Sequence, residues 1–395
     1  MRVLHIGKYY PPFSGGIENF MGDLLPCHAR SGLKVCTLVH NHDPSITRTQ
    51  IETREGVLIY RVPCHGNLLY APVSPLFPIV LVQALKAFKP DIIHLHMPNT
   101  SAFWTLFIPA IKKIPMVVHW HSDVVQSGID TRLKIAYSFY KPFEQALLKR
   151  SVAVIATSFP YMDTSPALKN WLKKTFVIPL GIKNSRVHVS GKIREWAEKT
   201  WGDSKTRFLC VGRLTYYKGH DKLVRAIAKI PEARVIIVGK GELKNSLKKI
   251  ILELGIEKQV TLIGYLEEEK LEALLSSSHC LVLPSIERTE AFGVVLLEAM
   301  RAGKSSIIFN IKGSGTTWVV KDKITGLCVP LNNESRLIHS IQTLAANPGV
   351  FRVMGENARQ RFQTKYDITR IADSFITLYE RSVNVFKRRD LDGNI

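Results

Sequence analysis

The chain has 395 residues, of which 46% are hydrophobic and 22% charged. This length predicts two domains, and this composition excludes a largely disordered protein. The 54 Lys and Arg residues outnumber the 33 Asp and Glu residues, for a formal net charge of +21. A basic surface favours an anionic partner, namely nucleic acid, acidic lipid or a phosphorylated substrate. Because the basic residues are spread over both halves, with no zinc-finger or RNP-type motif, we expect no nucleic acid partner.

The cysteines and the N-terminus indicate the compartment. The six cysteines form no CxxC pair, and most lie in apolar runs, which is typical of buried thiols in a reducing environment. The first residues, MRVLHIGKYYPPF, contain too short an apolar stretch for a signal peptide. The apolar windows Leu76–Leu85 and Ala102–Ile111 are too short to span a bilayer. We therefore expect a cytoplasmic protein.

Short β-branched runs alternate with amphipathic stretches, which is typical of parallel sheets covered by helices on both faces. In the first half the predicted strands are Val3–Ile6, Val35–His40, Ile92–His96, Met116–His119 and Val152–Ala156; the predicted helices include Glu18–Arg30, Ile79–Phe88 and Arg132–Lys149, the last interrupted at Pro142. A second series of strands follows at Phe208–Val211, Val235–Val238, Val260–Ile263, Cys280–Leu283 and Ser306–Phe309. The pattern predicts an α/β protein with two doubly wound, Rossmann-like domains.

The polar stretch that precedes the second series marks the domain boundary. We expect a first domain over residues 1–187 and a second over residues 188–366. Residues 367–395 are expected to form a C-terminal helix, packing back toward the N-terminal domain, and then a basic tail that frays.

Three strand-to-helix junctions carry residues suited to ligand binding, because doubly wound sheets bind ligands beyond the carboxyl ends of their strands. At the first junction, Gly15 and Gly16 follow a proline-stiffened loop and precede a helix. Such a loop lets bare backbone approach a phosphate or a sugar. The alternative is an ordinary turn whose glycines are needed for positive φ.

The second junction places Arg213 and Lys218 on a short loop after the strand Phe208–Val211. A guanidinium fork and an ammonium point charge suit a diphosphate. The alternative is a solvated basic loop.

The third junction carries Glu290 before an apolar helix and Glu298 within it. A carboxylate on an apolar surface is costly unless it binds hydrogen-bond donors, so the two could hold hydroxyls while the helix start faces an anion. The alternative is a pair of acidic groups that interact only with the helix dipole and solvent.

Together these residues resemble the retaining glycosyltransferases of family 4, which have the two-domain GT-B fold. The matching motifs are Gly15-Gly16, Gly212-Arg213 with Lys218-Gly219, the paired glutamates of EAFGVVLLEAM, and the supporting segments Val177–Ile182, Gly239–Glu242 and Thr325–Leu327. They span nearly the whole chain in the family's order. The resemblance implies two Rossmann-like domains that face each other across a cleft.

The resemblance also implies roles for individual residues. Glu290 would contact donor-sugar hydroxyls, and Glu298 would hold the nucleotide ribose. Arg213 and Lys218 would neutralise the donor diphosphate, with the Gly15-Gly16 loop closing over it. The amides of Phe292 and Gly293 would face the sugar or its phosphate. His121 would lie near the reacting sugar, with His119 as its rival and a core histidine as the alternative.

The implied reaction moves a hexose from a nucleoside diphosphate with retention of configuration. It needs no cofactor and no metal, because cations and a helix dipole can compensate the leaving diphosphate. The HWHSD segment and Gly313–Gly315 resemble a bacterial mannosyltransferase-like subset that builds O-antigens, capsules and exopolysaccharides. We expect GDP-mannose as the donor, with UDP-sugars or a non-catalytic nucleotide-binding scaffold as alternatives.

The acceptor side is less specified. Thr131–Arg150 mixes basic and aromatic residues, and Ala102–Ile111 is aromatic and apolar. Such a surface suits acidic lipids. We expect peripheral binding to the inner face of the cell membrane, with a lipid-linked saccharide as acceptor. The alternative is a core helix with a solvated basic side.

Overall fold

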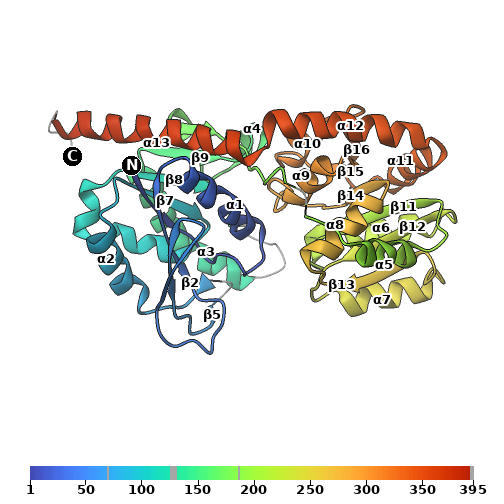
Figure 1. Ribbon diagram of the computed structural model, residues 1–395, viewed down its shortest axis with the longest axis horizontal. Coiled ribbons are helices and arrows are strands. Elements are labelled where there is room, and N and C mark those ends of the chain that lie inside the picture. Colours follow the sequence, from blue (N-terminus) through green and yellow to red (C-terminus); the bar gives the residue numbers. More distant parts are fainter. Residues whose placement is uncertain (69–70, 125–130, 186, 392–395) are drawn as a thin grey trace. The chain divides into compact units, whose positions relative to one another are not determined.

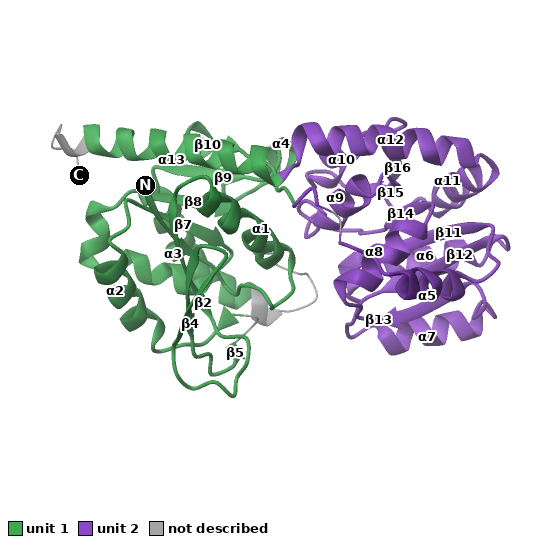
Figure 2. Cartoon of the chain, in the orientation of Figure 1, with its two compact units in different colours: residues 1–182, 368–395 green, residues 183–367 purple. Residues whose placement is uncertain are grey.

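The computed structural model describes residues 1–68, 71–124, 131–185 and 187–391, and it divides into two compact units (Figure 2). Unit 1 comprises Met1–Ile182 and Ile368–Ile395, and unit 2 comprises Lys183–Asp367. The division falls a few residues before the expected position near 187.

Unit 1 is built around an eight-stranded sheet with the order β10-β9-β8-β7-β1-β2-β4-β3. Its elements are β1 (Arg2–Ile6), α1 (Gly16–Arg30), β2 (Lys34–His40), β3 (Gln50–Arg54), β4 (Val57–Val62), β5 (Asn67–Leu68), β6 (Ala71–Pro72), α2 (Phe77–Phe88), β7 (Ile92–Met97), the 3₁₀ segments η1 (Thr100–Leu106) and η2 (Pro109–Lys113), β8 (Met116–Trp120), α3 (Thr131–Arg150), β9 (Ala153–Ala156), α4 (Phe159–Thr164), η3 (Leu172–Lys174), β10 (Thr175–Val177) and α13 (Ile368–Leu391). All pairings in this sheet are parallel except the one between β3 and β4.

Three features of unit 1 differ from the expectations. The edge hairpin β3–β4 was not expected, and every residue of β3 is exposed. Helix α3 continues through Pro142, so the predicted interruption is wrong. Helix α13 continues to Leu391, into the segment that was expected to fray.

The first and last helices of unit 1 pack together over one face of its sheet (Figure 1). Phe20 of α1 lies edge-on to the ring of His119, and Phe375 of α13 lies beside the same ring. Tyr379 of α13 is fully buried, and its hydroxyl lies 2.5 Å from Nδ1 of His94. The C-terminal helix is therefore part of the core of unit 1.

Unit 2 contains a six-stranded parallel sheet with the order β13-β12-β11-β14-β15-β16. Its elements are α5 (Gly191–Trp201), β11 (Thr206–Val211), η4 (Tyr216–Lys218), α6 (His220–Ile227), β12 (Ala233–Val238), α7 (Lys244–Glu253), β13 (Val260–Gly264), α8 (Glu268–Ser277), β14 (Cys280–Leu283), α9 (Val294–Arg301), β15 (Ser305–Asn310), α10 (Thr316–Val319), β16 (Gly326–Pro330), α11 (Glu334–Ala346) and α12 (Pro348–Lys365).

Helices cover both faces of this second sheet. Alternate strand residues such as Phe208 and Cys210 share a core with α6, α7 and α11. Helices α8 and α9 contact β11 and β14, respectively. Two doubly wound α/β units are thus confirmed.

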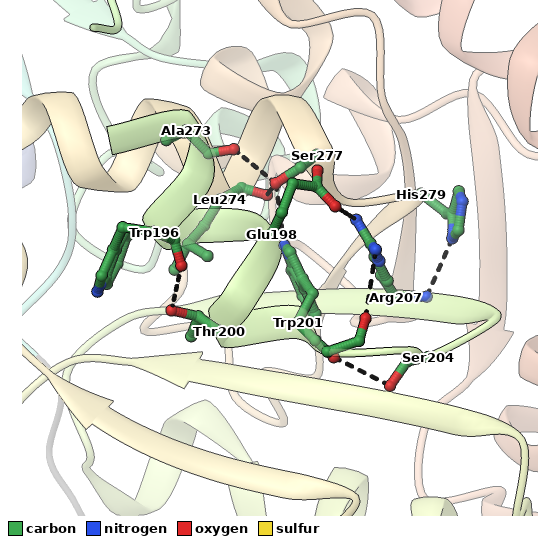
Figure 3. A network of polar contacts seen from close by, with 11 residues as sticks. Trp196, Glu198, Thr200, Trp201, Ser204, Arg207, Ala273, Leu274, Ser277 and His279 are labelled. Atoms are coloured by element: carbon green, nitrogen blue, oxygen red, sulfur yellow. Dashed lines mark hydrogen bonds and ion pairs between the residues drawn. The ribbon is translucent and has the colours of Figure 1, made fainter. Parts of the chain in front are cut away.

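A polar network ties α5 and α8 to the amino ends of β11 and β14 (Figure 3). Arg207 donates to Glu198 at 2.7 Å, and its backbone N–H donates to the His279 ring at 3.0 Å. The Trp201 indole donates to Ser277 at 3.0 Å. Because this network lies at the amino ends of the strands, it supports the fold away from the ligand-binding edge.

Five of the six cysteines are buried and Cys328 is partly buried, all as free thiols. Within the described part of the chain, no helix has the length and hydropathy to cross a membrane.

Candidate functional site

The sheet of unit 2 has its topological switch point between β11 and β14. Strands β12 and β13 continue from β11 to one side, whereas β14, β15 and β16 continue to the other. In doubly wound sheets, the loops at such a point leave the carboxyl ends of the two strands in opposite directions, and ligands bind there. Lys218 lies on the loop after β11 and Glu290 on the loop after β14.

Lys218 and Glu290 form an ion pair across this switch point. Lys218 Nζ lies 2.5 Å from Glu290 Oε2, and the two side chains are only 12% and 10% exposed. The Ser285 hydroxyl donates to the same carboxylate oxygen at 2.8 Å. Burial alone would lower the pKa of Lys218, but the Glu290 carboxylate reverses this and raises that pKa above its ordinary value. The ammonium is therefore held in its charged form.

The loop after β15 fixes the backbone around Glu290. The Ser314 hydroxyl donates to the Glu290 carbonyl at 2.5 Å, and the Gly315 N–H donates to the Ala291 carbonyl at 2.8 Å. Ser314 is fully buried. Loops after three neighbouring strands thus set the position of one carboxylate.

The loops after β11 and β14 also touch through their backbones. The Ile286 N–H donates to the Tyr217 carbonyl at 2.8 Å. Gly219 has φ +63°, and a Cβ at this position would collide with the Pro284 carbonyl. Glycine is therefore required next to Lys218.

Arg213 is more exposed than Lys218. Its guanidinium lies 3.5 Å from the Tyr217 hydroxyl, and its carbonyl accepts a hydrogen bond from His220 Nε2 at 3.0 Å. The two predicted cations therefore differ, because Lys218 has a buried carboxylate partner and Arg213 extends from the loop surface. A purely solvated basic loop does not describe Lys218.

Helix α9 begins where the Glu290 loop ends. Gly293 precedes it with φ +79°, and the Phe292 ring is buried edge-on against Tyr366. The first N–H groups of a helix have no partner within it, so they are suited to an anion. Glu298, in the second turn of α9, is partly buried. Its side chain therefore does not lie fully in solvent.

In unit 1, Gly15 directly precedes helix α1, which begins at Gly16. Gly15 has φ −171°, so the alternative that these glycines are needed for positive φ is wrong. A Cβ on Gly15 would instead require the Glu18 carboxylate, the end of a flexible side chain, to move aside. The preceding loop is anchored by Arg61, which donates to the carbonyls of Tyr10 at 3.3 Å and Pro11 at 2.5 Å. Sequence reasoning missed Arg61 because about fifty residues separate it from this loop.

The two candidate histidines occupy different positions on β8. His119 lies within the strand, fully buried between aromatic side chains of α1 and α13. His121 follows the strand, at the carboxyl edge of the sheet. Its backbone N–H donates to the Met97 carbonyl at 3.0 Å. Burial lowers the pKa of His121 to about 3, so its ring is neutral at physiological pH. This position favours His121 over His119 as a ligand-contacting residue.

Apolar side chains gather on the surface of α3 and η1. We call Trp104, Phe107, Ile135, Phe139 and Phe143 the aromatic patch; they are 41%, 60%, 59%, 73% and 40% exposed. The last three follow at intervals of four residues along α3 and therefore share one side of it. The exposed Lys112, Lys113, Lys134 and Lys141 lie on the same segments or next to them. The alternative of a core helix with only a basic exposed side does not account for these apolar side chains.

A separate hollow of about 660 Å³ lies in unit 2 beside α6 and α7. Its walls include Tyr216, Lys222, Leu247 and Glu287. None of the predicted site residues lines it, so the candidate site rests on the switch-point geometry instead.

Comparisons with known proteins cover both units. Residues 15–181 match the model of the glycosyl transferase 4-like domain, and residues 192–361 match that of the glycosyl transferases group 1. The O-antigen chain mannosyltransferase C of Escherichia coli is 31% identical over 383 residues, which are 96% of this chain and 98% of that protein. The D-rhamnosyltransferase WbpZ of Pseudomonas aeruginosa is 29% identical over 92% of this chain and 91% of its own length. Among solved structures, the sucrose-phosphate synthase of Thermosynechococcus elongatus superposes with a TM-score of 0.78 at 24% identity, covering 96% of this chain and 98% of that one.

Proposed function

Because the chain belongs to the group 1 glycosyltransferases and has their GT-B fold, we propose that it is a retaining hexosyltransferase whose unit 2 binds a nucleoside-diphosphate sugar. The observation that carries this proposal is the buried Lys218–Glu290 pair at the switch point. A fixed cation, a fixed carboxylate and a helix start then surround one place. A sugar linked to a diphosphate needs all three.

In this proposal the chemistry depends on stabilising the leaving diphosphate. Lys218, Arg213 and the N-terminus of α9 would compensate the charge that develops on the diphosphate as the glycosidic bond breaks. Glu290, held by Lys218 and Ser285, would accept hydrogen bonds from donor-sugar hydroxyls. Glu298 would hold the ribose.

The loops at the carboxyl edge of the unit 1 sheet would contact the donor diphosphate, the reacting sugar and the acceptor. We assign Gly15 and Gly16 to backbone contact with the donor diphosphate, and His121 to contact with the transferred sugar. The anchoring of the loop by Arg61 supports this assignment, because a preformed loop costs less to order on binding.

We propose GDP-mannose as the donor and a lipid-linked saccharide of cell-surface polysaccharide assembly as the acceptor. The similarity to the O-antigen chain mannosyltransferase C supports this choice. The alternative donor is a UDP-sugar. Thermal shifts with GDP, UDP, ADP and TDP distinguish the bases, because a ligand that binds the folded state raises its melting temperature. A larger shift with UDP than with GDP would replace the proposed donor.

Two variants test whether the switch point is the donor site. Lys218→Ala should abolish the thermal shift by the preferred nucleotide, whereas Arg225→Ala, which removes an exposed cation from α6, should leave it unchanged. Glu290→Ala should abolish sugar transfer. If Glu290→Ala transferred sugar at the wild-type rate, the chain would instead be a nucleotide-binding scaffold.

We also propose that the aromatic patch binds the anionic inner face of the cell membrane. Exposed aromatic side chains with neighbouring lysines suit the interface of acidic lipids. In liposome flotation, anionic vesicles should recover more protein than neutral ones. Phe139→Ser should reduce this recovery, and Leu252→Ser, at a 68% exposed position on α7, should not. Equal recovery with both kinds of vesicle would exclude this membrane role.

A further inference from the structure

One face of the unit 1 sheet carries five buried histidines. His5 lies on β1, His94 and His96 on β7, His119 on β8 and His121 just after β8. None is more than 5% exposed. Burial lowers the pKa of each of them, so all five rings are neutral at physiological pH.

Three of these rings form a continuous hydrogen-bonded line, which we call the histidine row. His5 Nδ1 lies 3.1 Å from His96 Nε2, and His96 Nδ1 lies 3.0 Å from His121 Nε2. The ring planes differ by only 24° and 18°, respectively. The row runs from the middle strand β1 to the carboxyl edge of β8.

The same histidines also lie close enough together to suggest a metal site. Ring nitrogens of His5, His94 and His96 lie within 4.8 Å of one another, as do those of His96, His119 and His121. However, His119 stacks on His121 at 3.9 Å with an angle of 26° between their planes. His94 stacks on His96 at 4.3 Å and 12°. Nitrogen lone pairs lie in the ring plane, so stacked rings direct them side by side instead of toward one ion. The geometry favours hydrogen bonding over metal binding.

The row allows only two arrangements of its protons. A neutral imidazole has one N–H and one lone pair, and each hydrogen bond needs one of each. If His96 carries its proton on Nδ1, this N–H donates to Nε2 of His121, and Nε2 of His96 accepts a hydrogen bond from Nδ1–H of His5. All three rings are then protonated on Nδ1. If His96 carries it on Nε2, all three are protonated on Nε2. The tautomer of His121 is therefore coupled to those of His96 and His5.

The ends of the row decide between the two arrangements. Among the described residues, neither His5 Nε2 nor His121 Nδ1 has a hydrogen-bond partner, and both atoms are buried. One of them must carry the unpaired N–H, which is costly unless an acceptor arrives. His5 is enclosed beneath α1 and α13, whereas His121 lies at the edge where doubly wound sheets bind ligands. The arrangement with Nδ1–H throughout therefore places the unpaired donor on His121, the ring at this edge.

We propose that His5 and His96 are positioning residues that hold His121 in its Nδ1–H tautomer, so that it donates a hydrogen bond to a hydroxyl or phosphate oxygen of the bound sugar substrate. This rests on the role assigned to His121 in the proposed function. The substrate oxygen completes the row.

The tautomers can be read directly from the full-length protein labelled with ¹⁵N-histidine. Solid-state NMR distinguishes protonated from unprotonated ring nitrogens, and single-histidine variants assign the signals. We expect Nδ1 to be protonated in His5, His96 and His121 alike. Mixed tautomers along the row, or a His121 protonated on Nε2, would overturn the proposal. Stoichiometric metal in the purified protein would also overturn it.

A matched pair of variants tests the consequence for the reaction. His96 and His119 are register partners on neighbouring strands, and both are buried. His96→Phe breaks the row, whereas His119→Phe removes an equally buried ring for which no hydrogen bond is seen among the described residues. We expect His96→Phe to lower kcat by about tenfold and to release His121 from its single tautomer. His119→Phe should leave kcat within about twofold and the His121 tautomer unchanged.

Nucleotide binding separates this proposal from the proposed function. Both variants should retain the wild-type thermal shift with the preferred nucleotide, since neither His96 nor His119 is among the residues assigned to nucleotide binding. Equal losses of kcat in both variants would show a structural effect and refute the role of the row. Loss of the nucleotide response in the wild type would instead refute the donor site. If His96→Phe does not fold, the wild-type NMR spectrum alone decides the proposal.

Discussion

Replacing Glu144 by Gln should remove a pH-dependent loss of stability from unit 1. Glu144 lies on α3 and is fully buried, and its Oε1 accepts hydrogen bonds from Tyr137 at 3.2 Å and Gln145 at 3.4 Å. Its Oε2 is buried without a partner among the described residues. Burial, together with the charge of Asp123, raises the pKa of Glu144 from 4.5 to about 7, although Lys141 and the hydrogen bonds oppose this. Below about pH 7 the folded chain therefore holds this carboxyl mainly in its protonated form.

The sign and size of the effect follow from linkage. Above pH 4.5 the carboxyl ionises in the unfolded chain but keeps its proton in the folded one, so stability falls as the pH rises toward about 7. The full loss is about 3.4 kcal/mol, at about 1.36 kcal/mol per pH unit, and about 2.5 kcal/mol of it falls between pH 5 and pH 8. In Glu144→Gln this group no longer titrates. The variant should therefore gain about 2.5 kcal/mol relative to wild type across that interval.

Scanning calorimetry of both proteins at several pH values measures the difference. For a unit of this size, 2.5 kcal/mol corresponds to a relative change in Tm of about 5–10 °C. Any pH-independent destabilisation by the Gln side chain cancels, because only the change with pH in the Tm difference between variant and wild type is compared. Glu356→Gln, at a side chain that is 70% exposed on α12, is the control and should show no such change. A Tm difference between Glu144→Gln and wild type that is the same at pH 5 and pH 8 would refute the reasoning.

Four further single variants and one double variant test the site and its supports. Lys218→Met and Glu290→Gln should each lower kcat/KM by about 100-fold. Because the pair acts as a unit, kcat/KM of the double variant should fall by much less than the product of the two single losses. Full additivity in steady-state kinetics would argue against a shared role. Glu272→Gln should destabilise unit 2 by about 3 kcal/mol in urea unfolding, because it removes the carboxylate charge that lies 3.0 Å from the buried Arg301 guanidinium. An unchanged midpoint would contradict this. Arg61→Met should raise the donor KM more than it lowers kcat, since it frees the Gly15 loop; an unchanged KM would show that this anchor is dispensable.

The sequence predicted most central strands of the two sheets because they are buried on both faces and therefore read as apolar runs. The prediction nevertheless omitted β4, although this strand is mostly buried. The sequence did not predict β3, whose residues are all exposed, because a solvated edge strand has no apolar pattern to find. Pro142 was expected to interrupt a helix, yet α3 continues through it. In this case the tertiary packing of α3 overrides the local preference.

The candidate site was only partly predictable. The strand-end rule found Lys218 and Glu290, but their pairing depends on which strands lie side by side, and this order is not written in local sequence. The histidine row does have a signal in the sequence. His94 and His96 are two residues apart, as are His119 and His121, so each pair shares one face of its strand. Their hydrogen bonds to one another still require the register between strands.

The return of α13 to unit 1 means that the chain passes between the units twice, near Ile182 and near Asp367. Unit 2 is therefore one uninterrupted segment, whereas unit 1 is assembled from two separate pieces of the chain. A protease cut near Ile182 would divide the chain into two fragments, and the packing of α13 against the rest of unit 1 would still hold them together. Residues 1–182 expressed alone would lack Phe375 and Tyr379, which complete the core of unit 1. A stop codon before α13 should therefore destabilise unit 1 more than unit 2, although unit 2 directly precedes α13 in the chain.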